Sequence, residues 1–305
     1  MSLAVVWHPS YEVDIGPHVF PTAKYRLIRD QLLAEHTLTA ADFVAPEPAS
    51  HDDVLLVHTR EYVEKILAGR LSVAEQLLLE VPFSTDLREA MWRCAGGSIR
   101  TAQLALQHGI AVHLGGGFHH AFADHGEGFC LINDVAIAIR ALRRDGALER
   151  ALVLDCDVHH GNGTASIFVA DPTVFTMSIH QDHNYPAWKP PSDLDLALRD
   201  RTGDAEYQAL LERHVPQIVR QHAPDLVFYL AGADPYAEDQ LGGLRLTIEG
   251  LRRRDQFVMD ALRTEGVPAA VVLAGGYARR PDDTVEIHCN TVRAAKVGSL
   301  RDLRA

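Results

Sequence analysis

The sequence predicts an α/β protein with three α/β/α layers around a central, mainly parallel sheet. Short apolar runs rich in Val, Leu and Ile recur without strict alternation, as expected of strands covered on both faces. Longer helical patterns separate these runs, and strand–helix–strand repetition favours a parallel sheet with helices on both faces. Repeats, low-complexity tracts and flexible linkers are absent. We therefore expect residues 1–305 to form a single domain.

Six segments are expected to be strands. Each is short, and most are rich in Val, Leu and Ile, which suits a buried position in a parallel sheet. They are Ala4–Trp7, Ile110–Leu114, Ala151–Asp155, Val174–Ile179, Asp225–Ala231 and Ala269–Ala274.

The helices expected between the strands have recognisable ends. Gly109 is a plausible C-cap of the longest one, and Asn133 an N-cap residue of another. The run from Ser50 to Asp53 has the spacing of a capping box. The expected helices are Thr22–Glu35, Ser50–Leu67, Thr85–His108, Asn133–Arg144, Asp204–His222 and Thr247–Thr264.

The most irregular stretch runs from His180 to Gly203 and contains Pro186, Pro190 and Pro191. It is predicted to be a long surface loop. Long loops in compact domains are often functional, so this segment is a candidate part of a site.

Composition restricts the function. The chain has 29 Lys and Arg against 41 Asp and Glu, a net charge of −12, which disfavours nucleic acids and anionic membranes as partners. The acidity favours cationic partners, although it also serves solubility. No signal-peptide pattern and no run of about 20 apolar residues is present. The four cysteines form no CxxC pair, so we expect free thiols and a cytoplasmic location.

Polar residues gather just after the expected strands, where ligands bind in α/β sheets. Three glycines, from Gly115 to Gly117, precede His119 and His120. The glycines allow a close backbone approach, and two imidazoles suit general acid–base chemistry near neutral pH. Taken alone, an adjacent histidine pair is more often structural than catalytic.

A second strand end carries Asp155, Asp157 and His159, which share one side of an extended chain. Buried carboxylates are costly unless they are paired or bind a cation. Carboxylate and imidazole ligands suit zinc, and also iron, manganese or cobalt. This segment therefore predicts a metal site.

Asp234 and Tyr277 follow two further strands. By itself Asp234 could be a turn residue before Pro235, and Tyr277 could serve packing. Together the four strand ends supply three metal ligands, two histidines and a phenol. Three protein ligands with an open coordination position are typical of a catalytic zinc site.

These residues resemble the histone deacetylase superfamily, which shares its fold with arginase. The similarity implies an arginase/deacetylase-like fold over most of the chain. The HisGlyAsnGly variant at His160–Gly163 and the short length resemble the class IV branch and its bacterial relatives. Besides the four segments, the matching motifs are Val57-His58-Thr59 with Tyr62, Gly126–Cys130 with Asn133-Asp134, Ser178-Ile179-His180, and Asp239 with Leu241-Gly242-Gly243.

The resemblance implies a role for each site residue. Asp157, His159 and Asp234 would hold Zn²⁺, with Fe²⁺ as an alternative, while His119 and His120 would act as acid and base and Tyr277 would donate to the substrate carbonyl. The substrate tunnel would be lined by Gly117, Phe129, Tyr185 and Gly276. A structural K⁺ would be held by Asp155, Asp157, His159 and Ser178.

One position departs from many family members, which have an aspartate where this chain has Asn162. Asn orients an imidazole but does not stabilise its positive charge as a carboxylate does. We expect Asp155 to support a cationic His119, and His120 to be less basic.

The implied activity is removal of acetyl or longer acyl groups from lysine side chains, by hydrolysis of the amide. Acylated lysine peptides or proteins would be the partners, with acylated polyamines as the alternative. An arginase-like enzyme would need two manganese ions and more aspartates than these segments provide. A non-catalytic acyl-lysine binding protein is the alternative from another class, and would be expected to have lost a ligand, a histidine or the tyrosine.

Overall fold

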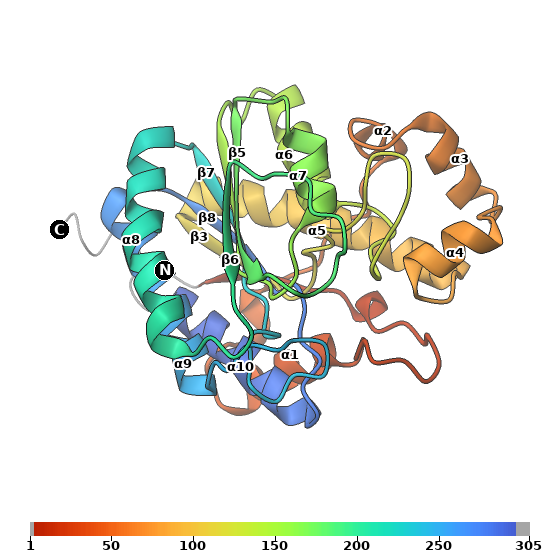
Figure 1. Ribbon diagram of the computed structural model, residues 1–305. Coiled ribbons are helices and arrows are strands. Elements are labelled where there is room, and N and C mark those ends of the chain that lie inside the picture. Colours follow the sequence, from red (N-terminus) through yellow and green to blue (C-terminus); the bar gives the residue numbers. More distant parts are fainter. Residues whose placement is uncertain (1–2, 297–305) are drawn as a thin grey trace.

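The computed structural model describes residues 3–296, which include one sheet of eight parallel strands in the order β2-β1-β3-β8-β7-β4-β5-β6 (Figure 1). The fold class predicted from the sequence is confirmed. The strands are β1 Ala4–Val6, β2 Phe43–Val44, β3 Ile110–His113, β4 Ala151–Asp155, β5 Val174–Gln181, β6 Leu194–Leu198, β7 Leu226–Leu230 and β8 Ala269–Val272.

Helices cover both faces of the sheet and make three layers (Figure 1). On one face, apolar side chains of α1, α8, α9 and α10 pack in a single cluster with those of the strands. On the other face, α5, α6 and α7 do the same. These helices are α1 Lys24–Ala34, α5 Thr85–His108, α6 Asp134–Arg144, α7 Asn162–Phe168, α8 Asp204–His222, α9 Ile248–Glu265 and α10 Pro281–Lys296.

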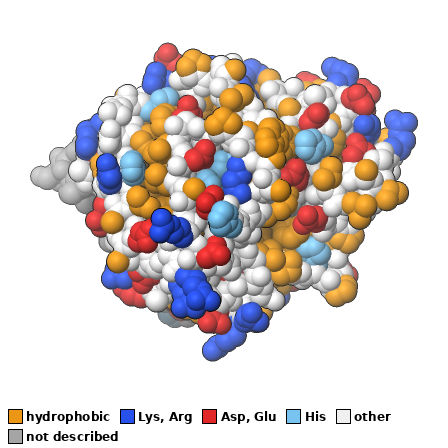
Figure 2. Space-filling view, viewed as in Figure 1, with side chains coloured by type: hydrophobic (Ala, Val, Ile, Leu, Met, Phe, Trp, Pro, Cys, Tyr) orange, Lys and Arg blue, Asp and Glu red, His pale blue; other side chains and the backbone are white. Residues whose placement is uncertain are grey.

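A third cluster lies beyond the sheet, where the N-terminal segment and three short helices pack on the first half of α5. These helices are α2 His51–Val54, α3 Arg60–Leu67 and α4 Val73–Leu79, seen at the right of Figure 1. Figure 2 shows acidic and basic side chains interspersed on the viewed face. It also shows hydrophobic side chains on the right, where α4 exposes Val73, Leu77 and Leu78.

All six expected strands are present, and the prediction of a loop over His180–Gly203 is partly wrong. Its beginning continues β5, and β6 lies inside it, paired in parallel with β5 from Met177↔Leu194 to Gln181↔Leu198. In this edge strand Asp195 and Ala197 are exposed and the three leucines are more buried, so it lacks the continuous apolar run of the central strands. Strand β2 was missed because it has only two residues.

The single helix expected over Ser50–Leu67 is also wrong. Ser50 forms the predicted capping box with Asp53, but α2 ends at Val54. Thr59 then caps α3 by accepting a hydrogen bond from the Tyr62 amide, while its own amide donates to the Ala123 carbonyl at 2.8 Å. This tie to a distant loop separates the two helices. Helices α4, α7 and α10 were not expected.

The four cysteines are free, as predicted, and all four are buried. Within residues 3–296, no helix combines the length and the apolar character that crossing a membrane requires.

Candidate functional site

The polar residues singled out in the sequence converge at the carboxyl ends of five adjacent strands, in the order β3, β8, β7, β4 and β5. Parallel strands end on the same side of the sheet, so segments far apart in the chain meet there. The side chains of His119, His120, Asp157, His159 and Asp234 are all at least nine-tenths buried.

Asp157, His159 and Asp234 form a compact group whose ligand-type atoms lie within 4.8 Å of one another. His159 Nδ1 is 3.0 Å from Asp157 Oδ1 and 3.4 Å from Asp234 Oδ2. Asp234 Oδ2 is buried and has no hydrogen-bond partner among the described residues. A buried carboxylate oxygen without a partner is costly, and a bound cation would satisfy it.

Backbone amides orient both carboxylates of this group. The Val158 amide donates to Asp234 Oδ1 and the Gly275 amide donates to Asp157 Oδ2, each at 2.8 Å. A Cβ at Gly275 would overlap the carboxylate of Asp234, which explains the glycine at this position. The remaining carboxylate oxygens face His159.

The electrostatics of the group favour a bound cation. Burial and the neighbouring Asp157 carboxylate raise the pKa of Asp234 to about 7. Burial by itself would lower the pKa of His159, but its contacts with Asp157 and Asp234 raise that pKa to about 10. Without a metal, the raised pKa values mean that His159 and Asp234 keep protons near neutral pH. These protons balance the negative charge that a bound cation would otherwise balance. One imidazole and two carboxylates fit zinc or another divalent transition metal.

His119 and His120 lie beside this group in different environments. His119 Nδ1 is 2.6 Å from Asp155 Oδ2, and the two Nε2 atoms of the histidines are 3.1 Å apart. Burial opposes a charge on His119, yet the Asp155 and Asp157 carboxylates raise its pKa to about 9. Burial and the adjacent cationic His119 hold the pKa of His120 well below its usual value. The pair therefore carries one positive charge, which lies on His119, while His120 is neutral.

His120 is oriented by Asn162 rather than by a carboxylate. His120 Nδ1 lies 2.7 Å from Asn162 Oδ1, and Asn162 Nδ2 donates to Glu127 Oε1 at 2.8 Å. The Tyr185 hydroxyl donates to the same Glu127 oxygen. The Asn162 carbonyl fixes a proton on His120 Nδ1 and leaves Nε2 as the basic nitrogen. Glu127 thus places a negative charge one hydrogen bond beyond Asn162, an arrangement that the sequence did not reveal.

Two connected pockets lead to the group. The inner pocket, of about 30 Å³, is lined by Phe20, Tyr25, Gly116, Gly117, Phe118, His119, His120, Gly128, Phe129, Cys130, Asp157, His159, Ala274, Gly275 and Tyr277. The outer pocket, of about 140 Å³, is lined by Glu80, His120, Gly128, Phe129, His159, Asn184, Tyr185, Leu241 and Tyr277. A vacant space therefore adjoins the metal-type ligands, the two histidines and the phenol.

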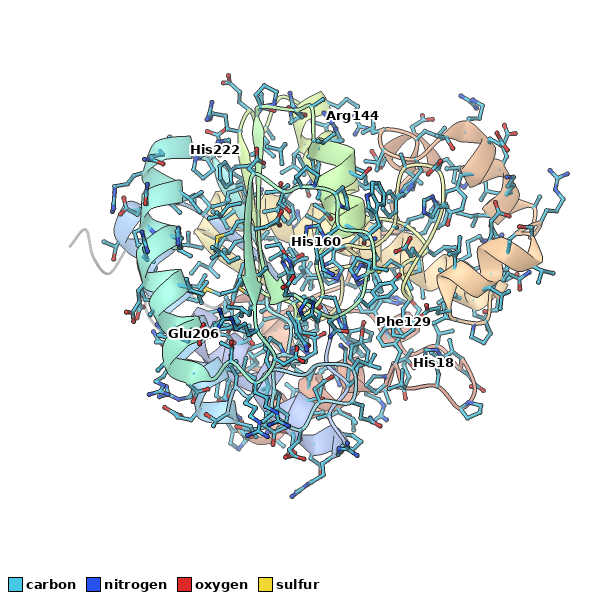
Figure 3. All side chains as sticks on the ribbon, in the orientation of Figure 1. His18, Phe129, Arg144, His160, Glu206 and His222 are labelled. Atoms are coloured by element: carbon cyan, nitrogen blue, oxygen red, sulfur yellow. The ribbon has the colours of Figure 1, made fainter. Side chains whose placement is uncertain are left out.

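Of the four residues expected to line the tunnel, three line one or both pockets and Gly276 lines neither. Phe129 lines both pockets and lies beside His18, as Figure 3 shows, with ring centroids 4.9 Å apart. Tyr185 forms the wall of the outer pocket, and its ring is 4.9 Å from that of His120. Gly117, with a φ of +83°, lines the inner pocket. Gly276 is not among the lining residues of either pocket, because it faces Ala233, Thr284 and His288.

Residues 18–292 match the family model of the histone deacetylase domain. The chain belongs to the histone deacetylase family. An uncharacterised protein of Picosynechococcus is 41% identical over 97% of this chain and 99% of its own length. A probable deacetylase of Methanothermobacter thermautotrophicus is 32% identical, covering 90% and 86%. Histone deacetylase 2 of Arabidopsis thaliana is 26% identical, covering 91% and 75%.

The fold agrees with a solved structure as well. The crystal structure of the HDA15 HD domain superposes with a TM-score of 0.78 at 23% identity, covering 97% of this chain and 89% of that one. At this identity the similarity supports the deacetylase fold alone. Family membership supports a metal-dependent hydrolase that acts on amides.

Three carboxylate residues of this histone deacetylase family member, two that position site backbone and one that lines the outer pocket, were missed as site residues. Asp134 accepts from the amides of Gly117 and Phe118 and so holds the loop before the histidines. Asp239 accepts from the Tyr277 amide at 2.7 Å. Glu80 lines the outer pocket. In the sequence, Asp134 follows Asn133 at the start of a predicted helix and therefore suggests helix capping. Its contacts with the loop before the histidines are evident only in the folded chain.

The residues expected to hold K⁺ also lie together in part. Asp155 and Ser178 are register partners on the adjacent strands β4 and β5. Asp155 Oδ1 accepts from the Asp157 amide, and the Ser178 hydroxyl contacts His180 Nδ1 at 2.9 Å. The assignment of K⁺ to this place stays a prediction.

Proposed function

We propose that this protein is a zinc-dependent lysine deacylase with acetyl-lysine as its first substrate. The observation that carries the proposal is the convergence of Asp157, His159 and Asp234 beside two histidines and Tyr277 at the end of a pocket. Its three-ligand set leaves room for a substrate atom, as catalytic zinc sites do. Membership of the histone deacetylase family supports the same chemistry.

Asp157, His159 and Asp234 are the residues that would hold the metal. When bound, zinc supplies a Lewis acid that polarises the amide carbonyl and makes water more acidic. Fe²⁺ fits the same ligands. The buried Asp155 and Ser178 would hold K⁺ nearby.

His120 is the proposed general base, because it is neutral and lines both pockets. His119, held in its cationic form by Asp155, is the proposed general acid that protonates the leaving amine. Tyr277, whose ring centroid is 6.4 Å from that of His159, would donate a hydrogen bond from its hydroxyl to the developing oxyanion. The buried environment strengthens each of these interactions, since the pocket excludes bulk water.

The tunnel fits a methylene chain that ends in an amide. Phe129, Tyr185 and Leu241 give the outer pocket apolar walls, which suit the four-carbon stem of lysine. The inner pocket is small, and Phe20, Tyr25 and Phe118 bound it. Its volume of about 30 Å³ favours an acetyl group over longer acyl chains.

An acetylpolyamine deacetylase is the second candidate, and one observation favours it. Glu80 lies in the lining of the outer pocket, and burial and the nearby Glu127 raise its pKa. A carboxylate at this place could accept a cationic amine of a polyamine, or equally a backbone amide of a peptide. We further propose that residues 1–305 act as one catalytic domain built on the single sheet.

A substrate panel tests the proposal. Peptides carrying acetyl- to myristoyl-lysine and free acetylputrescine are compared by kcat/KM, with metal analysis of the same sample. We expect acetyl-lysine peptide to be hydrolysed fastest, with turnover abolished by a chelator and restored by Zn²⁺. Faster hydrolysis of acetylputrescine, lost in Glu80→Gln, would select the polyamine function. Tight binding of acetyl-lysine without turnover in the zinc-loaded protein would contradict both.

A further inference from the structure

A second group of metal-type ligands lies outside the candidate active site. His160, His180 and Asp195 bring one ligand-type atom each to within 4.8 Å of the others. His160 follows β4, His180 lies on β5 and Asp195 on β6, so three neighbouring strands contribute. Figure 3 shows His160 in the interior of the molecule, close to these strands. None of the three is used in the chemistry proposed above.

Each imidazole of the group brings a ring nitrogen within 4.8 Å of the Asp195 carboxylate. His160 Nε2 is 3.1 Å from Asp195 Oδ1 and 3.2 Å from the Ser192 hydroxyl. His180 Nδ1 is 2.9 Å from the Ser178 hydroxyl, which leaves Nε2 as its available ligand atom. Such a hydrogen bond to the second ring nitrogen is the usual way in which a protein orients a metal-binding imidazole. The two rings stand edge to face, with centroids 4.8 Å apart.

Burial and access also suit an ion. His160 is fully buried and His180 is 2% exposed, whereas 32% of the Asp195 side chain is exposed. Solvent therefore reaches the group at Asp195, which gives an ion a way in. A pairing of one carboxylate with one imidazole accounts for His160 and Asp195. That pairing does not explain why His180 lies beside them. A cation bound by all three side chains would explain it.

We propose that His160, His180 and Asp195 bind a second divalent transition-metal ion of the zinc class. Two imidazoles and one carboxylate are a common zinc ligand set, and the Ser192 hydroxyl or a water would complete four-fold coordination. Softer thiolate ligands are absent from this group, so it suits Zn²⁺ rather than Cu⁺.

The site would have a structural role in forming the tunnel. His180 lies just before the segment 182–191, and Ser192 and Asp195 lie just after it. A metal bound by both ends would close this segment into a loop. The loop carries Tyr185, the wall of the outer pocket, which donates to Glu127 at 2.8 Å. The metal would thereby hold Tyr185 against the pocket without touching substrate.

Metal content distinguishes this site from the first one. Each purified protein is saturated with Zn²⁺, freed of excess ion and measured by mass spectrometry of the metal. We expect about two equivalents in the wild type, about one in His180→Gln and in Asp195→Asn, and about one in Asp157→Ala. Combining His180→Gln with Asp157→Ala should leave essentially none. Neither result depends on deacylase activity, so failure of this inference and failure of the proposed function can be told apart.

Matched controls make the result decisive. His183→Gln makes the same exchange on a neighbouring histidine whose side chain is 85% exposed, and it should retain about two equivalents. If His180→Gln does not fold by circular dichroism, Asp195→Asn on the partly exposed edge strand gives the answer. One equivalent in the wild type that Asp157→Ala removes entirely would overturn the inference. So would a second equivalent that persists in Asp195→Asn and in a folded His180→Gln variant.

Discussion

His119 and His120 are consecutive in the chain, yet their surroundings give them different proton affinities. His119 contacts a carboxylate at 2.6 Å, while His120 contacts the neutral carbonyl of Asn162 at 2.7 Å. Burial disfavours a charge on either ring, but the Asp155 and Asp157 carboxylates raise the pKa of His119, and the cationic His119 in turn lowers the pKa of His120. An acid and a base are thereby defined within one dipeptide.

The first prediction at the residue scale concerns Tyr277. Replacing it with phenylalanine removes one donor to the oxyanion and leaves the metal ligands intact. Loss of one such donor typically lowers kcat by about 10²–10³-fold. Steady-state kinetics of Tyr277→Phe with zinc analysis should show that loss at unchanged metal content. Loss of the metal in this variant would show that the role given to Tyr277 is wrong.

The second concerns Asn162. In Asn162→Asp a carboxylate contacts His120 and should raise the pKa of that imidazole, because an opposite charge favours the protonated form. His120 acts as a base when neutral, so the low-pH limb of kcat/KM should move to higher pH by about one unit. Nearby Glu127 would repel the new charge, so Asn162→Asp with Glu127→Gln is the cleaner variant. Superimposable pH–rate profiles in these variants and the wild type would contradict the division of roles.

At the scale of elements, α5 is the helix on which the N-terminal segment rests. Gly96 and Gly97 lie in its middle and are buried against the chain around Glu47 and against Tyr11 and His113. These glycines are needed for close approach rather than for a special φ. The approach brings Tyr11 to 2.9 Å from His113 Nε2, beneath the glycine loop that leads to the catalytic histidines.

This packing predicts that Gly96→Ala destabilises the protein. Helix propensity alone would favour alanine by about 1 kcal/mol. The added Cβ would overlap the backbone carbonyl of Glu47, and such overpacking costs about 1–3 kcal/mol or more. Urea denaturation should show a net loss of free energy of unfolding.

Gly250→Ala in α9 is the matched control for this exchange. There the new Cβ would meet the carboxylate of Asp204, a side chain that is partly exposed and can move. We expect a smaller loss in Gly250→Ala than in Gly96→Ala. Equal stability of Gly96→Ala and wild type would show that the segment around Glu47 does not rest on α5 as described.

At the scale of the whole molecule, the sheet brings together residues that are far apart in the chain. Because Asp157, His159 and Asp234 meet in this way, the free energy of unfolding should depend on both metal binding and pH. Without metal, the raised pKa values of Asp234 and His159 mean that the folded chain binds more protons than the unfolded chain. These groups therefore contribute stability below their folded pKa values that is lost as pH rises through about 7 and about 10.

Zinc replaces those protons, so its stabilising effect should grow with pH. The difference in Tm between zinc-loaded and chelator-treated protein should increase from about pH 6 to about pH 8.5. Differential scanning fluorimetry measures it. Asp157→Ala, which lacks a ligand of the cluster, should lose most of this pH-dependent difference. A difference that stays constant over the same range would mean that the metal does not displace protons from these residues.

The sequence by itself determined the α/β class, the six main strands and the identity of the residues that meet at their ends. It could do so because buried parallel strands are apolar throughout, and because polar groups placed directly after them are costly without a ligand. The roles given to those residues rested on the family resemblance.

Only the tertiary structure decided which other segments contact these residues. Edge strand β6 was hidden because it follows Pro190 and Pro191 closely and buries only its alternate residues, and the break at Thr59 depends on a hydrogen bond to Ala123. Likewise, Glu127 behind Asn162 and Asp195 beside His160 are contacts between segments separated by more than thirty residues. Local patterns carry no information about such distances, because the order of strands in the sheet sets them.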